Sequence, residues 1–126
     1  MLNMLVVAVG AAVGANLRYL ISTWAAQRFG SGFPYGTLLI NVTGCLVIGI
    51  VLTLAATKIT LSEPLRLLVV TGLLGGYTTF SSFGYEAFAL IGGGNWAGAA
   101  IYLAGSLSLG LGAVFLGAGL VRLLGG

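Results

Sequence analysis

Charged residues and histidine are scarce in this chain of 126 residues. Only 6% of its residues are charged, whereas soluble domains carry about a quarter. Because it has no histidine and only two acidic residues, ordinary zinc sites and histidine-dependent acid–base sites are excluded. The single cysteine, Cys45, is expected to be a small buried residue rather than a reactive thiol or a disulfide partner. An enzyme is the least expected class, since the chain offers no pair of nucleophile and base.

Apolar residues are abundant, at 59% of the chain, and the mean hydropathy is +1.13. The long apolar runs are residues 3–24, 35–57, 65–91 and 96–122. Each has the roughly 20 residues needed to cross a bilayer core of about 30 Å. The first run lacks a basic stretch ahead of it and is interpreted as a span rather than a signal peptide. The chain, residues 1–126, is therefore expected to be an all-α multi-pass membrane protein with a single transmembrane domain of four helices.

The net charge of +3 comes from scattered cations, which do not form the basic patch that nucleic-acid binding requires. One side of the membrane receives Lys58, Arg66 and Arg122, and the other receives Arg28 with Arg18. Such a weak bias permits insertion in both orientations. Four helices are too few for the paired inverted repeats of most transporters, so an antiparallel pair of chains is a working hypothesis.

Polar residues inside the spans fall on defined helix faces. In the second span Thr37 and Asn41 are four residues apart, and Cys45 continues the same face. In the fourth span Tyr102 and Ser106 have the same spacing. A polar group in hydrocarbon costs free energy unless it has a partner, so these faces are expected to point toward protein or a water-filled path.

Helix packing is the alternative interpretation of these faces. Glycines four residues apart let helices approach closely, although the pattern is common in apolar helices. The pairs at this spacing are Gly10/Gly14, Gly72/Gly76 and Gly94/Gly98. For Asn41, a binding or pore role is favoured over packing because its amide can make several hydrogen bonds.

Residues 71–83, TGLLGGYTTFSSF, concentrate poor helix formers in the middle of the third span. The weak positions are Gly72, Gly75, Gly76, Thr78 and Thr79. They predict a helix broken near its middle, whose unpaired carbonyls suit a hard cation such as sodium. A phosphate-binding loop is rejected, because the lysine of such a loop and its strand–turn–helix context are both missing.

After the predicted break, Phe80 and Phe83 share a helix face, with Ser81 and Ser82 between them. They are either two core aromatics or rings whose positive edges meet an anion. Glu86 lies near the end of the span and is a functional candidate by default. Arg18 is interpreted as an entrance or structural residue.

Three stretches together resemble a known family. GAAVGANLRYL at 10–20, PYGTLLINVTG at 34–44 and GLLGGYTTFSSF at 72–83 are similar to the signatures of the Fluc fluoride channels, also called CrcB proteins. The resemblance covers essentially the whole chain. It implies a fluoride-selective channel that passively exports toxic fluoride across the cytoplasmic, or inner, membrane. It also implies an antiparallel dual-topology homodimer in the lipid bilayer, with two pores and a central structural sodium ion that is not transported.

The resemblance also implies roles for particular residues. The sodium ion would be bound by the backbone carbonyls of Gly75 and Thr78 in each subunit. Asn41 would donate to fluoride, and Phe80 and Phe83 would offer it their ring edges. The other residues implied for the path are Thr37, Ser81, Ser82, Glu86, Tyr102 and Ser106. One position departs from the family, since a hydroxyl is expected at 110 and the chain has glycine there, with water or a neighbouring backbone group as substitute.

Two other classes of membrane protein fit the sequence less well. Small multidrug exporters are also short and four-helical, but they depend on a carboxylate in the first helix, and residues 3–24 contain none. A structural or accessory subunit would use its glycines only for packing. That interpretation leaves Asn41, the broken third span and the phenylalanine pair without a shared purpose.

Overall fold

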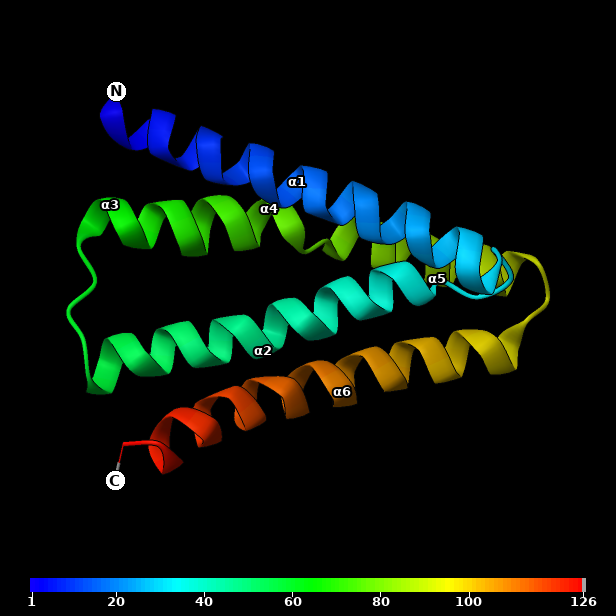
Figure 1. Ribbon diagram of the computed structural model, residues 1–126. Coiled ribbons are helices and arrows are strands. Elements are labelled where there is room, and N and C mark those ends of the chain that lie inside the picture. Colours follow the sequence, from blue (N-terminus) through cyan, green and yellow to red (C-terminus); the bar gives the residue numbers. More distant parts are fainter. Residues whose placement is uncertain (126) are drawn as a thin grey trace.

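The computed structural model describes residues 1–125, which form helices joined by short connections (Figure 1). The elements are α1 (Leu2–Phe29), α2 (Tyr35–Thr57), α3 (Glu63–Arg66), the π-helix η1 (Leu67–Leu74), α4 (Gly75–Tyr77), α5 (Phe80–Gly92) and α6 (Trp96–Leu123). The segment from α3 to α5 is one membrane-crossing unit, so four segments are long and apolar enough to span a bilayer. The prediction of four spanning helices is confirmed.

The span boundaries differ from the predicted ones by a few residues. The first helix continues to Phe29, five residues beyond the predicted end, because the chain reaches no helix breaker before Gly30. Gly30 has a φ of 80°, in the left-handed region that favours glycine, and its N–H still bonds to the Ala26 carbonyl. The third span begins at Glu63 with Pro64 in its first turn, where a missing N–H costs nothing.

The four spans pack in two layers that share the third span (Figure 1). Helix α1 lies along η1 and α4. Helix α2 lies along α6, and these two helices run in the same direction. The second half of the third span, α5, leaves α1 and contacts α6. The break between α4 and α5 is therefore the point at which the third span passes from one layer to the other.

Glycine makes the contact between α1 and the third span possible. A Cβ on Gly10 or Gly14 would collide with backbone of η1, and a Cβ on Gly72 or Gly76 would collide with backbone of α1. For Gly76, the Cβ would lie 2.6 Å from the carbonyl oxygen of Ala11. The backbones thus touch directly, and the packing prediction for these two pairs is confirmed.

The third predicted pair, Gly94/Gly98, packs no two helices together within residues 1–125, so that prediction was wrong. Gly94 has a φ of 78° and forms the turn before α6. Gly98 lies in the first turn of α6, where its N–H donates to Oδ1 of Asn95 at 2.9 Å. This contact is an N-cap, a local signal that the spacing of the glycines concealed.

Most buried positions on α6 are small residues, and many large apolar residues of this helix face outward. Buried positions on α6 include Ala99, Gly110, Ala113 and Gly117. Large side chains on the outside of the same helix include Ile101, Leu107, Leu109, Leu111, Phe115 and Leu116. This pattern is expected when lipid, rather than water, surrounds the helices.

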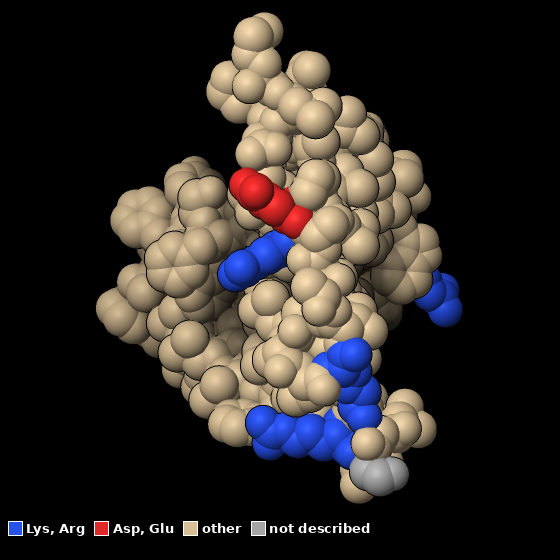
Figure 2. All heavy atoms as spheres, turned by 90° about the vertical axis from the view of Figure 1, so that its left-hand side faces the viewer, with Lys and Arg blue, Asp and Glu red and all other residues tan. Residues whose placement is uncertain are grey.

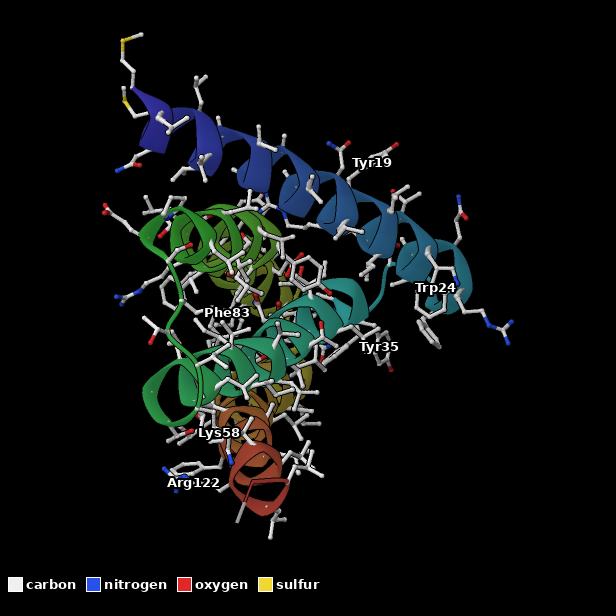
Figure 3. The ribbon with its side chains drawn as sticks, turned by 60° about the vertical axis from the view of Figure 1, so that its left-hand side comes forward. Tyr19, Trp24, Tyr35, Lys58, Phe83 and Arg122 are labelled. Carbon is white, nitrogen blue, oxygen red and sulfur yellow. The ribbon has the colours of Figure 1, made fainter. Side chains whose placement is uncertain are left out.

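Several charged side chains lie at one end of the molecule. Figure 2 shows basic side chains gathered on the end where α2 and α6 finish and α3 begins, together with an acidic group. Lys58 follows α2, and Arg122 lies in the last turn of α6. Figure 3 places these two side chains near each other at that end.

Candidate functional site

The third span breaks at Thr78 and Thr79, whose backbones are extended. Thr78 has φ −78° and ψ 158°, and Thr79 has φ −151° and ψ 119°. The prediction of a break near the middle of this span is confirmed. The glycines before it are helical, and Gly72 and Gly76 pack against α1.

Asn41 holds the break open. Its Oδ1 accepts a hydrogen bond from the Thr79 N–H at 2.9 Å, and its Nδ2 donates to the Thr79 carbonyl at 3.0 Å. In a continuous helix the Thr79 N–H would donate to the carbonyl of Gly75. The amide of Asn41 therefore takes the place of one helical hydrogen bond and releases the Gly75 carbonyl from it.

Two threonine hydroxyls complete the ends of the half-helices. The Thr78 hydroxyl donates to the Leu74 carbonyl at 2.9 Å. The Thr79 hydroxyl accepts from the Ser82 N–H at 3.2 Å and lies 3.0 Å from the Ser82 hydroxyl, which makes Thr79 the N-cap of α5. Sequence reasoning missed this cap, although a threonine followed three residues later by a polar residue was the signal for it.

Arg18 reaches the same break from α1. Its Nη1 donates to the carbonyl oxygen of Thr78 at 3.4 Å, a long hydrogen bond. The structure thus gives Arg18 a contact in the middle of the third span. One of the two carbonyls that the resemblance assigns to sodium lies beside this guanidinium.

Two predicted path residues donate to the carboxylate of a third. The Thr37 hydroxyl donates to Oε1 of Glu86 at 2.8 Å, and the Tyr102 hydroxyl donates to Oε2 at 2.6 Å. Tyr102 is only 1% exposed, and its ring packs on Phe83 with centroids 5.2 Å apart. Thr37 and Glu86 also line a cavity of about 460 Å³ at the end of the molecule formed by the connections before α2 and α6.

A second cavity, of about 400 Å³, lies at the break. It is lined by residues of α2, the third span and α6, including Asn41, Cys45, Thr78, Thr79, Phe83 and Ser106. Phe83 is 8% exposed and lies in the interior between the third span and α2 (Figure 3). Phe80 also lines this cavity but is 82% exposed, with its ring centroid 5.7 Å from that of Phe83.

The structure therefore brings most of the predicted site residues to two neighbouring places. Thr37 and Glu86 line the end cavity, and Tyr102 bonds to Glu86. The cavity at the break is lined by Asn41, Gly75, Thr78, Phe80, Phe83 and Ser106. Ser82 takes part in the cap of α5. Ser81 is exposed and lies 3.5 Å from the Thr79 hydroxyl.

Comparison with known proteins decides the family. The model of the family described as CrcB-like protein, Camphor Resistance (CrcB), matches residues 5–118. The chain belongs to the CrcB family. A protein of Chloroflexus aurantiacus named Fluoride-specific ion channel FluC is 61% identical to this CrcB protein over 124 residues, 98% of each chain. Relatives of the same name from Roseiflexus sp. and Rhizobium etli are 56% and 46% identical over 98% of this chain and 99% of each relative.

These comparisons confirm the family that the three signatures indicated. The names of the relatives describe an ion channel and not an enzyme, in agreement with the prediction. Together with the four spans, they make this chain a multi-pass membrane protein of a channel family.

Proposed function

We propose that this CrcB protein is a fluoride-selective channel that passively exports toxic fluoride across the cytoplasmic, or inner, membrane. It works as an antiparallel dual-topology homodimer with two pores and a central structural sodium ion. The observation that carries the proposal is a cavity with polar and aromatic side chains among its apolar lining, beside a helix break clamped by Asn41. That cavity lies in a chain 61% identical to a protein named as a fluoride-specific channel.

The residues around the break suit a small, strongly hydrated anion. Such an ion must exchange its water for other donors, and conduction requires that these donors release it again. The second amide hydrogen of Asn41, the hydroxyl of Ser106 and the ring edges of Phe80 and Phe83 are neutral groups of this kind. They attract fluoride without the strong hold of a fixed positive charge.

The two helix ends at the break favour ions of opposite sign. The carbonyl end of α4 carries partial negative charge, and the N-terminus of α5 carries partial positive charge. Broken helices in other transporters use their ends in this way for cations and anions. In the proposed channel the α4 end holds the structural cation, and the α5 end faces the anion path.

Glu86 has a defined place near one end of the path. Because its carboxylate accepts from the hydroxyls of Thr37 and Tyr102, both hydroxyls are already oriented within the membrane. Exchange of these donors between the carboxylate and an arriving fluoride ion would let the ion pass without leaving a polar group unpaired. The end cavity supplies the approach from water.

The exposed surface of the single chain supports a dimer. Phe80, Ser81 and Gly75 are exposed beside the break, and the partly exposed Arg18 contacts the break. Polar backbone and a guanidinium facing lipid at this depth cost free energy, which a second copy would remove. The second copy would also close the cavity at the break, to which Phe80 contributes from the exposed surface.

The residues at the break fit a sodium ion. Sodium, a hard cation, prefers oxygen ligands such as backbone carbonyls. Asn41 takes the N–H that would otherwise occupy the Gly75 carbonyl, and the Thr78 carbonyl accepts only the long bond from Arg18 among residues 1–125. When bound, the ion would supply positive charge that fixes the two breaks together. Each copy would contribute the carbonyls of Gly75 and Thr78.

Ion efflux from liposomes tests the channel. The purified protein is reconstituted with internal potassium fluoride and potassium chloride, and both anions are followed with selective electrodes after valinomycin is added. We expect rapid fluoride release that depends on valinomycin, without chloride release. Absence of fluoride release from dimeric protein would overturn the proposal.

Cysteine crosslinking tests the antiparallel arrangement separately. In a Cys45→Ser background, Gly75→Cys is expected to crosslink two copies, because Gly75 is exposed at the break and a Cβ there meets only the Val70 carbonyl, at 3.9 Å. Leu123→Cys is the matched control at a helix end. It should not crosslink within a dimer, because antiparallel copies place it on opposite faces of the membrane. Efficient crosslinking at Leu123 would indicate parallel copies.

A further inference from the structure

Helices α2 and α6 carry polar groups that lie side by side at intervals of one helical turn, and each such pair of positions is called a level. Helices α2 and α6 run side by side in the same direction, and each has a small or polar residue at every fourth position along the facing surface. The positions are Thr37, Asn41 and Cys45 on α2, and Tyr102, Ser106 and Gly110 on α6. Thr37 and Tyr102 meet on Glu86, and Asn41 and Ser106 line the cavity at the break.

At the third level, Cys45 of α2 faces Gly110 of α6, so only α2 provides a side chain. Gly110 is buried and has none, but a Cβ at this position would lie 3.4 Å from the sulfur of Cys45. The thiol is thus next to the place where the side chain of residue 110 would begin. Cys45 also lines the cavity at the break, one helical turn beyond Asn41.

Ser106, one turn from Gly110, leaves a polar group free for a ligand in this cavity. The Ser106 hydroxyl oxygen is buried and has no hydrogen-bond partner within residues 1–125. A buried hydroxyl without a partner is destabilising, and serine in a helix can bond back to its own turn. Ser106 lines the same cavity as Cys45, one turn from Gly110, so its free hydrogen-bonding capacity is available to an occupant there.

We propose that the Cys45 thiol takes the place of the missing hydroxyl at position 110 and donates to the permeating anion. This inference rests on the proposed function, because it extends the fluoride path by one level beyond Ser106. A thiol is a weak donor and stays neutral, so it offers fluoride a brief contact rather than a firm site. Neither water nor backbone is then needed to continue the path at this level.

Moving the donor from one helix to the other tests this inference. Cys45→Ala is expected to slow fluoride efflux about two- to ten-fold, the equivalent of one hydrogen bond. Adding Gly110→Ser to Cys45→Ala should restore the rate, because the sulfur that crowds position 110 is gone and a hydroxyl returns. Gly110→Ala in the same background is the matched control and should not restore it. Cys45→Ser alone should conduct at least as fast as the wild type.

The outcomes separate this inference from the channel proposal. All variants are compared with wild type as dimers of equal elution volume. If the wild type releases no fluoride, the proposed function fails. If the wild type conducts and Cys45→Ala conducts equally well, the thiol has no part in the path. Equal rates for the Gly110→Ser and Gly110→Ala double variants would also overturn the inference, because the effect would then come from packing and not from a donor.

Discussion

Replacement of Asn41 by alanine should destabilise the fold as well as the path. The variant loses both hydrogen bonds to Thr79 and leaves its N–H and carbonyl without their partner. Thr79 is only 8% exposed, and an unsatisfied buried backbone group costs about 1–3 kcal/mol. Two such groups predict a loss of about 2–6 kcal/mol in the free energy of unfolding. Asn41→Asp keeps the acceptor for the Thr79 N–H but sets a carboxylate oxygen against the Thr79 carbonyl and adds an unpaired charge in the membrane, so it should also destabilise the fold.

Unfolding in mixed micelles with increasing dodecyl sulfate measures this loss. Ser106→Ala is the matched control from the same cavity, since its hydroxyl has no partner to lose within residues 1–125. Its free energy of unfolding should change by about 0.5 kcal/mol or less, while its fluoride efflux falls. If Asn41→Ala were as stable as Ser106→Ala, the amide would not be what holds the break, and the reasoning would be refuted.

Three further predictions address packing, the rings and the cation. Gly10→Val should destabilise the fold by about 1–3 kcal/mol, because its Cβ would lie 2.9 Å from the backbone nitrogen of Leu73. Gly112→Ala is the control, because a Cβ there meets nothing within 4 Å in residues 1–125, and equal unfolding curves for the two variants would contradict the packing. Phe80→Ile and Phe83→Ile should slow fluoride efflux more than they change stability, since volume is kept and the ring edge is lost; normal efflux in both would make the rings packing residues. Replacing sodium with a large organic cation should weaken the dimer on size-exclusion chromatography, and an unchanged elution volume at low protein concentration would count against the structural ion.

Composition and hydropathy were enough to predict the four spans. Long apolar runs report directly on lipid contact, so the helices were found within a few residues of their ends. The end of the first helix was missed because QRF is polar enough to suggest a loop, although nothing before Gly30 stops the helix. The π-helix at Leu67–Leu74 was not predicted, since its apolar residues are also typical of an ordinary helix.

The break was predicted from its composition, but its construction was not. Poor helix formers in the third span predicted the break. The residue that bonds to the broken backbone, Asn41, lies on another helix, 38 positions away from Thr79. The contact of Arg18 with Thr78, across 60 positions, could not be read from local sequence for the same reason. The partner of Gly110 was likewise hidden, because the register between α2 and α6 depends on packing that spacing alone does not give.

The most direct test of the account is the reversal potential of currents through the purified protein in a planar bilayer. Fluoride and chloride are placed in opposing gradients across the membrane, with the same cation on both sides. If the path selects fluoride, the current will reverse at the potential set by the fluoride gradient alone. Reversal at the chloride potential, or at a potential between the two, would contradict a fluoride-selective path.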